Sequence, residues 1–376
     1  MTTSTTAHAA RLAAAATATA DAGIDALLLT SGADLRYLTG YAALPLERLT
    51  CLVVPATGDP VLIVPRLEHA AAIASGAGEA VKIESHEETD DAFRMVARLI
   101  ADAVGRPAGT IGLADRMWAE QVLRFRDAMP QAEQVLAGVV TRRLRVRKRS
   151  DEVDALRRAG QAIDRVHQRM GEWLRPGRTE AEVGRDIADA IIAEGHETVN
   201  FVIVGSGPNG ASPHHQLSER VIEQGDPVVV DIGGAMPDGY CSDCTRTYLA
   251  GGKAPSEFAD YYTVLHEAQL ASCASVRPGV SAESVDAAAR DVIAAAGYGE
   301  LFIHRTGHGI GLEEHEDPYI VSGNDTILEP GMCFSIEPGI YSPGHHGARI
   351  EDIVVVTDDG VERLDTIDRD LVVLDG

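Results

Sequence analysis

The 376-residue sequence predicts a small α/β domain followed by a larger α+β domain with an internal pseudo-twofold duplication. Residues 1–140 alternate short apolar strands with helices. A basic stretch separates them from residues 153–376, so we expect a linker over 141–152. In the second part, residues 225–251 and 331–356 have the pattern of two copies of one carboxylate-bearing β-hairpin. Two domains are also the prior for a chain too long for one hydrophobic core.

Short apolar runs bounded by turn residues predict the strands of the first domain. We expect these strands at Ile24–Thr30, Cys51–Pro55, Val61–Val64, Val81–Glu84, Thr110–Leu113 and Val135–Val139. Helical spacing predicts helices at Ala9–Ala22, Leu67–Ala74, Asp91–Val104 and Met117–Ala128. The alanine-rich start lacks the apolar stretch of a signal peptide, so we interpret it as a frayed lead into the first helix.

Basic residues crowd the segment from Thr141 to Arg149, ahead of Ser150, which fits a helix N-cap. The residues that follow keep the spacing of a long amphipathic helix: Val153, Leu156, Gly160, Ile163, Val166 and Met170. We interpret the basic segment as a solvated linker that pairs with acidic groups. With 33 basic against 57 acidic residues and a net charge of −24, the chain is a poor partner for nucleic acid or an anionic membrane.

A helix precedes each hairpin and is duplicated as well. Thr179 and Ser281 each follow a Pro-Gly pair, lie 102 residues apart, and are each followed by a stop glycine, Gly195 or Gly297. Thr179 with Glu182 also fits a capping box. The first strands are offset by 106 residues and the return strands by 108, so a helix-plus-hairpin unit recurs in the same order.

Four acidic residues occupy matched places on the two hairpins. Asp231 and Glu337 each stand six residues after a glycine, at the end of an apolar run, while Asp243 and Glu351 each stand four residues after a glycine on the return strand. Burying four ionised carboxylates costs several kcal/mol each unless cations compensate them. The pattern therefore predicts a metal site.

Between the hairpins lies the glycine-rich segment Phe302–Leu312. In extended conformation His304, Thr306 and His308 share one face, and the glycines on the other face permit close approach of a backbone or a metal. Alone, His308 would more often be a core histidine than a ligand. One imidazole with four carboxylates is a ligand set for two divalent ions, Mn²⁺, Co²⁺, Fe²⁺ or Zn²⁺, and its oxygen dominance favours Mn²⁺ over a zinc site of sulfur and nitrogen.

Five motifs resemble the ligand motifs of the pita-bread metallopeptidases, which include methionine aminopeptidases, Xaa-Pro aminopeptidases, prolidases and creatinase. They occur in the family's order and are Val230–Gly233, Cys241–Thr247, Gly307–Gly311, Ser335–Gly339 and Arg349–Asp352. The segment Leu35–Gly40 is similar to the creatinase/prolidase N-terminal domain. The likeness spans essentially the whole chain and is nearest to short Xaa-Pro dipeptidases of the actinobacterial type.

The resemblance implies a role for each motif residue. It gives the metal ligands as Asp231, Asp243, His308, Glu337 and Glu351, with Asp243 and Glu351 touching both ions or chelating. Two such ions bridge a water, lower its pKa and deliver hydroxide to the scissile carbonyl.

Glu337 also resembles the family's general base, His214 the histidine that stabilises the oxyanion, and His315 the one that contacts the P1′ side of the substrate. His215 competes with His214 for its role. Tyr341 and Arg349 resemble residues that orient Asp231, with a core tyrosine and a surface ion pair as the alternative.

We therefore expect metal-dependent hydrolysis of Xaa-Pro dipeptides by a cytoplasmic homodimer. One alternative is an Xaa-Pro aminopeptidase that takes longer peptides, and another is a creatinase-like hydrolase of small amides. Five cysteines imply a reducing compartment without a disulfide framework, and no apolar run reaches the ~20 residues of a membrane span.

Two motifs are decoys. Gly205–Gly210 spells the dinucleotide fingerprint, but prolines bracket it and no helical pattern follows, so we expect a turn into the catalytic loop. Cys241 and Cys244 form C-x-x-C on a strand, where they face opposite ways. We also expect Cys273 and Cys333 to be buried thiols, and His345 and His346 to be exposed at a hairpin tip.

Overall fold

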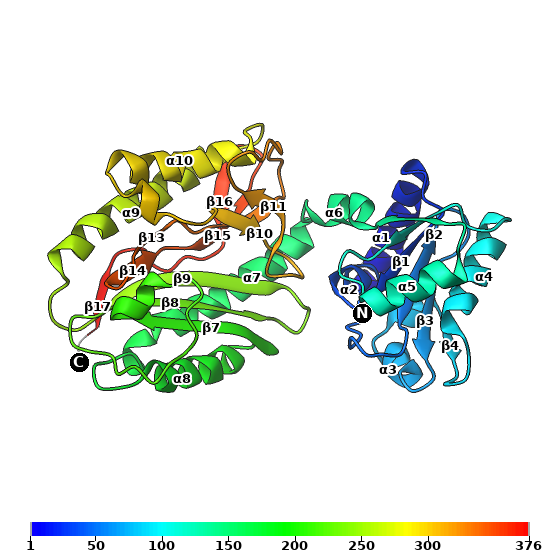
Figure 1. Cartoon of the computed structure of the whole chain (residues 1–376), viewed down its shortest axis with the longest axis horizontal. Coiled ribbons are helices and arrows are strands. Elements are labelled where there is room, and N and C mark those ends of the chain that lie inside the picture. Colours follow the sequence, from blue (N-terminus) through cyan, green and yellow to red (C-terminus); the bar gives the residue numbers. More distant parts are fainter. Residues whose placement is uncertain (1, 375–376) are drawn as a thin grey trace. The chain divides into compact units, whose positions relative to one another are not determined.

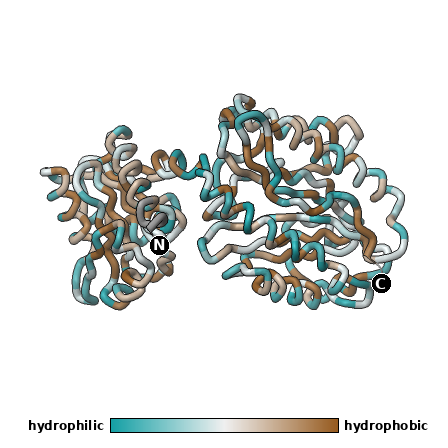
Figure 2. Tube along the Cα trace, turned by 180° about the vertical axis from the view of Figure 1, so that it is seen from behind, coloured by the Kyte–Doolittle hydropathy of each residue, from teal (hydrophilic) through white to brown (hydrophobic). Residues whose placement is uncertain are grey.

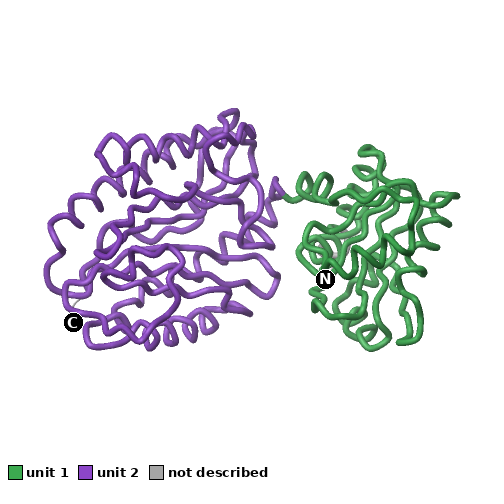
Figure 3. The backbone as a smooth tube through the Cα atoms, viewed as in Figure 1, with its two compact units in different colours: residues 1–145 green, residues 146–376 purple. Residues whose placement is uncertain are grey.

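A computed structural model describes residues 2–374, and the chain divides into two compact units, residues 1–145 and 146–376 (Figure 3). In both units the strands are mostly apolar, whereas many loops and the outer turns of helices are hydrophilic (Figure 2). Among the described residues no helix has the length and hydropathy needed to cross a membrane.

The first unit is built on a mixed six-stranded sheet in the order β4-β3-β2-β1-β5-β6 (Figure 1). Its strands are β1 Ala26–Thr30, β2 Cys51–Pro55, β3 Val61–Pro65, β4 Lys82–His86, β5 Thr110–Leu113 and β6 Glu133–Leu136. Its α-helices are α1 Thr2–Asp21, α2 Ala33–Thr39, α3 His69–Ala74, α4 Ala92–Val104, α5 Ala119–Ala128 and α6 Gly138–Arg145. β1, β2 and β3 pair antiparallel and the other neighbours pair parallel. The predicted strands are all present, within a few residues.

Much of the basic segment is helical, although the boundary between the two units, after Arg145, lies within the predicted linker 141–152. Residues 138–145 form α6, and the next helix, α7, begins at Ser150. The segment is helical because Val140 and Thr141 are buried, while Arg142 pairs with Asp115 at 3.0 Å. The last predicted strand also ends early, at Leu136, since Val139 belongs to α6.

The second unit has helices on both sides of its strands (Figure 1). The helices are α7 Ser150–Gln168, α8 Glu180–Ala193, α9 Ser256–Ser275 and α10 Ala282–Ala295. One sheet has the order β17-β9-β8-β7, with β7 Thr198–Ser206, β8 Pro227–Ala235, β9 Cys241–Ala250 and β17 Val372–Leu374. The other has the order β11-β10-β12-β15-β16, with β10 Gly307–Gly309, β11 Glu316–Ile320, β12 Cys333–Ile336, β15 Asp352–Val356 and β16 Val361–Arg363. The hairpin of β13 Gly339–Ser342 and β14 His346–Arg349 lies between β12 and β15 in the chain.

The duplication is confirmed down to single backbone hydrogen bonds. In the first half the amide of Gly177 donates to Ile222 O, and in the second half that of Gly279 donates to Leu328 O. The capping box between Thr179 and Glu182 is present as well. Gly177 and Gly279 both adopt positive φ, 89° and 88°, which a residue with a Cβ disfavours. The two halves therefore share one local structure.

Two details of the second hairpin were not predicted. Its strands are interrupted, at Glu337-Pro338 on one arm and Ile350-Glu351 on the other, where the first hairpin has the continuous strands β8 and β9. His346 is buried rather than exposed, because the β13–β14 hairpin packs against α9. The Nδ1 atom of His346 lies 2.7 Å from Tyr261 Oη. His345 is exposed, as expected.

The decoy motifs behave as the sequence indicated. After β7 the glycine-rich segment forms a short 3₁₀ turn, Gly207–Ala211, and leads into the loop that carries His214. Cys241 and Cys244 lie on β9 as buried cysteines, and Cys273 and Cys333 are buried as well.

Candidate metal centre

The residues expected at the site come together around one pocket of about 1000 Å³ in the second unit. Its lining includes the five expected ligands, both expected catalytic histidines and one of the two orienting residues: Asp231, Asp243, His308, Glu337, Glu351, His214, His315 and Arg349. Tyr341 lies behind the lining and is 2% exposed.

Strand register places the first two carboxylates. Asp231 on β8 pairs with Thr245 on β9, and Asp243 on β9 pairs with Gly233 on β8. The two acids are therefore diagonal neighbours on the same face of the sheet, offset by two positions along the strands. Glu337 and Glu351 stand at the two interruptions of the second hairpin. Because the strands break there, these side chains leave the sheet and reach the same pocket.

Ligand-type atoms of these residues form overlapping groups. One atom from each of Asp231, Asp243 and Glu351 lies within 4.8 Å of the others, and so does one from each of His308, Glu337 and Glu351. Glu351 belongs to both groups, and it is 1% exposed. Two adjoining groups that share a carboxylate are a suitable frame for two neighbouring cations.

The electrostatics of this cluster favour cations. Burial, followed by repulsion from neighbouring carboxylates, raises the pKa values of Asp243 and Glu351 well above their usual range, and burial also raises that of Asp231. Asp231 Oδ1 and Glu351 Oε1 are buried, and the described residues offer them no hydrogen-bond donor. Orphaned carboxylate oxygens of this kind fit oxygen-seeking divalent ions.

His308 has the orientation of a ligand. Its Nδ1 lies 3.1 Å from Gly309 O and donates to it, which leaves Nε2 facing Glu337 Oε1 at 3.2 Å and Asp243 Oδ2 at 3.6 Å. Although burial acts in the opposite direction, the hydrogen bond and charge of His308 lower the pKa of Glu337 to about 2. Glu337 is therefore ionised at neutral pH.

Arg349 holds two of the expected ligands in place. The buried guanidinium donates from Nη2 to Asp231 Oδ2 at 2.5 Å, from Nη1 to Tyr341 Oη at 2.7 Å, and from Nε to Thr245 Oγ1 at 3.1 Å. Thr245 in turn donates to Glu351 Oε2 at 2.7 Å. Arg349 is 2% exposed, so the alternative of a surface ion pair is wrong.

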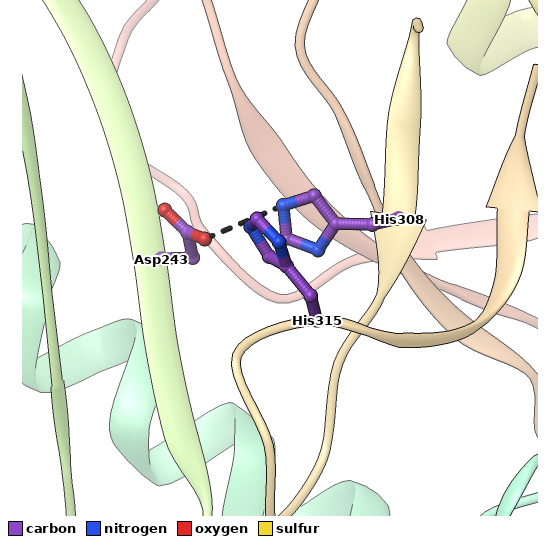
Figure 4. Close-up of side chains that lie close together, drawn as sticks. All are labelled: Asp243, His308 and His315. Carbon is purple, nitrogen blue, oxygen red and sulfur yellow. Dashed lines mark ion pairs between the residues drawn. The ribbon is translucent and has the colours of Figure 1, made fainter. Parts of the chain in front are cut away.

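His315 lines the pocket next to His308. Figure 4 shows its ring beside that of His308, with both facing Asp243, and the two ring centroids are 3.9 Å apart. Burial, with the neighbouring His308 and Arg305, lowers the pKa of His315 to about 4. A neutral imidazole at neutral pH can accept or donate a hydrogen bond to a ligand in the pocket.

The structure separates the two adjacent histidines that the sequence left in competition. His214 is exposed and lines the pocket. His215 does not line it, since its Nε2 lies 2.7 Å from Glu180 Oε2 behind the loop. His214 is therefore the member of the pair that a ligand can reach.

Sequence reasoning assigned no role to three side chains that support the site. His304 Nε2 lies 2.9 Å from Tyr341 Oη. Ser335 Oγ donates a hydrogen bond to Glu337 Oε1 at 3.0 Å and accepts one from His308 N at 3.0 Å. Thr245 could have been found, because it stands two residues after Asp243 on the same strand face. Ser335 stands on β12, two residues before Glu337, which lies just beyond the end of that strand.

Comparison with known proteins gives one family for the whole chain. Residues 154–358 match the model of metallopeptidase family M24, and residues 11–147 match the creatinase/prolidase N-terminal domain. The chain is 54% identical to a probable dipeptidase PepE of Mycobacterium tuberculosis, over 98% of this chain and 96% of that protein. It is 34% identical to an Xaa-Pro dipeptidase of Lactobacillus helveticus, over 94% and 96% respectively.

Solved structures agree. The crystal structure of dipeptidase PepE from Mycobacterium ulcerans superposes with a TM-score of 0.92 at 52% sequence identity, covering 98% of both chains. Together with the α/β first unit, the duplicated second unit and the buried acid-histidine cluster, these matches show that the chain is a metallopeptidase of family M24 with a creatinase/prolidase N-terminal domain.

Proposed function

We propose that this protein is a dimetal dipeptidase that hydrolyses the peptide bond of Xaa-Pro dipeptides. The observation that carries the proposal is the meeting of four carboxylates and one imidazole in a single pocket, where two buried carboxylate oxygens receive no hydrogen bond from residues 2–374. The similarity to dipeptidases over nearly the full chain supports the choice of a dipeptide. In this proposal the enzyme is a cytoplasmic homodimer.

The proposed ligands of the ion pair are Asp231, Asp243, His308, Glu337 and Glu351. Their donor set is rich in carboxylate oxygen and contains no thiolate, which suits Mn²⁺ in particular, and also Co²⁺, Fe²⁺ or Zn²⁺. When bound, the ions supply an activated water and polarise the scissile carbonyl. Arg349 and Tyr341 keep Asp231 oriented toward them.

Proton transfer is assigned to the chain's own side chains. Glu337 is ionised at neutral pH, so it can accept the proton of the attacking water and pass it to the leaving amine. His214, exposed at the pocket wall, donates to the oxygen on which negative charge develops. His315 contacts the P1′ side of the substrate, where its neutral ring completes the polar lining.

An Xaa-Pro aminopeptidase is the second candidate, because a pocket of about 1000 Å³ lies at the upper end of the range for small-ligand sites and leaves room for a longer peptide. A creatinase-like hydrolase of small amides is the third, and it is disfavoured because that chemistry does not need the full ligand set.

The test is a substrate panel with apo-protein reconstituted with Mn²⁺, Co²⁺ or Zn²⁺. We expect Ala-Pro to be cleaved, with Ala-Pro-Ala and creatine turned over far more slowly. Substantial turnover of the tripeptide alone would replace the dipeptidase by the aminopeptidase, and turnover of creatine alone would establish the third candidate.

A further inference from the structure

A fully buried carboxylate lies behind the loop that carries His214. Glu180 is the first residue of α8 and is 0% exposed. It accepts hydrogen bonds at 2.5–3.1 Å from five donors, all of them within residues 206–218: Ser206 N, Ser206 Oγ, Asn209 Nδ2, Ser218 Oγ and His215 Nε2. One side chain therefore organises the whole loop.

The charge of Glu180 suits this arrangement. Burial raises its pKa, but hydrogen bonds from Ser206, Ser218 and His215 outweigh burial and lower the pKa below the usual value. The carboxylate is thus ionised at neutral pH and lies at the positive end of a helix dipole. Hydrogen bonds to such an ionised acceptor are stronger than those between neutral groups.

The loop is held on both sides of His214. On one side Arg349 Nη2 donates to Pro213 O at 3.4 Å, and on the other His215 Nε2 lies 2.7 Å from Glu180 Oε2. Because His214 and His215 are adjacent in sequence, anchoring His215 behind the loop turns His214 toward the pocket.

The second half of the duplication shows that Glu180 is not needed for the backbone of this region. Glu180 N donates to Arg220 O at 3.1 Å, and its counterpart Ala282 N donates to Thr326 O at 2.9 Å. The same helix-to-loop contact thus forms around an alanine. At this first helical position, only the half whose loop carries His214 has a carboxylate.

We propose that Glu180 and His215 form a positioning pair that holds His214 in the orientation required to stabilise the reaction's oxyanion. The proposal rests on the function proposed above, in that His214 acts only on bound substrate. His215 itself touches no substrate, so its effect passes through His214.

The test uses four variants: His215→Leu, which cannot donate to Glu180; His215→Gln, whose amide can; His214→Ala; and the double variant His214→Ala/His215→Leu. We expect His215→Leu to lower kcat for Ala-Pro about 10–100-fold, since small misplacements of catalytic groups have effects of that size, with KM and metal content within about twofold. His215→Gln should regain most of the activity. The double variant should be no slower than His214→Ala, because both changes act through one group.

The matched control is His345→Leu, which removes an exposed histidine that does not line the pocket and should leave kcat unchanged. Parental kcat in His215→Leu, equal losses in His215→Leu and His215→Gln, or a further loss in the double variant would overturn the positioning role. A crystal structure of His215→Leu gives a readout independent of turnover: we expect His214 turned out of the pocket, and finding it in its parental place would also refute the inference. Absence of peptide hydrolysis by the parent enzyme would count against the proposed function alone.

Discussion

Arg349 is the side chain on which the geometry of the metal centre most depends. Its guanidinium donates hydrogen bonds to Asp231, Tyr341 and Thr245, and Thr245 in turn donates one to Glu351. A buried guanidinium also offsets part of the repulsion among the carboxylates. The sequence indicated Arg349 through its motif, but its hydrogen bonds depend on β8, β9 and β14 being packed together, which no local pattern reveals.

The hydrogen bonds of the Arg349 guanidinium can be tested by substitution. Arg349→Lys keeps the charge but loses the planar, multidentate geometry. We expect Mn²⁺ affinity to fall about 10–100-fold, as is typical when a partner of a metal ligand is lost. Titration with a competing chelator measures the change. Tyr341→Phe, which removes only one of the hydrogen-bond acceptors of Arg349, should weaken Mn²⁺ binding less. An equal or larger effect would contradict the role given to Arg349.

The second prediction concerns His167, a buried histidine of α7 away from the pocket. Its Nε2 donates to Cys244 O at 3.1 Å and its Nδ1 lies 2.8 Å from Tyr248 Oη, so the ring is held neutral. Burial, followed by the charge of Arg246, lowers its pKa to about 3. The unfolded chain, with an ordinary histidine pKa, takes up this proton first as the pH falls, so the native state loses stability below about pH 6.5.

Between pH 7 and 5 this group should lower the free energy of unfolding by about 2 kcal/mol. In His167→Asn that contribution is gone. The stability difference between parent and variant, measured by urea unfolding, should therefore shrink by about that amount over this pH range. A difference that stays constant would show that His167 titrates normally in the folded protein.

At the scale of elements, close packing between strands sets the position of His308. A Cβ built on Gly307 would lie 1.9 Å from Ser335 O, so β10 can approach β12 only with glycine at this place. The glycine at position 307 thus allows β10 to place the imidazole of His308 next to the hairpin that carries Glu337 and Glu351.

The third prediction follows from this contact. Gly307→Ala should destabilise the protein by about 1–3 kcal/mol through overpacking and should lower its metal content, because β10 and His308 must shift together. Gly360→Ala is the control, since a Cβ there meets nothing within 4 Å. Unfolding and metal analysis of both variants provide the check, and an unaffected metal content in Gly307→Ala would argue against the coupling.

Elements were predictable where the pattern is local. The capping box at Thr179, the repeated stop glycines and the apolar runs of the first unit each determine one helix or strand, and these agree with the structure. The helix α6 was not predicted, because its polar face is crowded with arginine and only Gly138, Val140 and Thr141 are buried. The interruptions beside Glu337 and Glu351 were missed as well, since they depend on how two halves of a hairpin bend around a pocket.

At the scale of the whole molecule, the duplication explains why four distant carboxylates could be predicted to lie together, whereas His308, which lies between the hairpins, was identified through the family's motif. Two halves with the same hairpin bring their matched carboxylates to one pocket. The sequence could not decide between His214 and His215, because both stand in one irregular loop whose orientation depends on Glu180, 34 residues before His214.

The fourth prediction concerns the stability of the second unit. Its clustered carboxylates repel one another, so ions that bind only the native state should stabilise it. Saturating Mn²⁺ should raise the midpoint of its thermal transition by about 5–10 °C relative to chelator-treated protein. Asp243→Asn should abolish most of this shift, and a shift that persists in the variant would locate the ions elsewhere.

We expect a pair of divalent ions to bind to Asp231, Asp243, His308, Glu337 and Glu351. The most direct measurement is anomalous diffraction from crystals of the parent protein soaked in Mn²⁺, recorded at the manganese absorption edge. We expect two neighbouring peaks within reach of these five side chains, as in other two-metal hydrolase sites. Density free of such peaks at this cluster, or peaks only at other residues, would contradict this expectation.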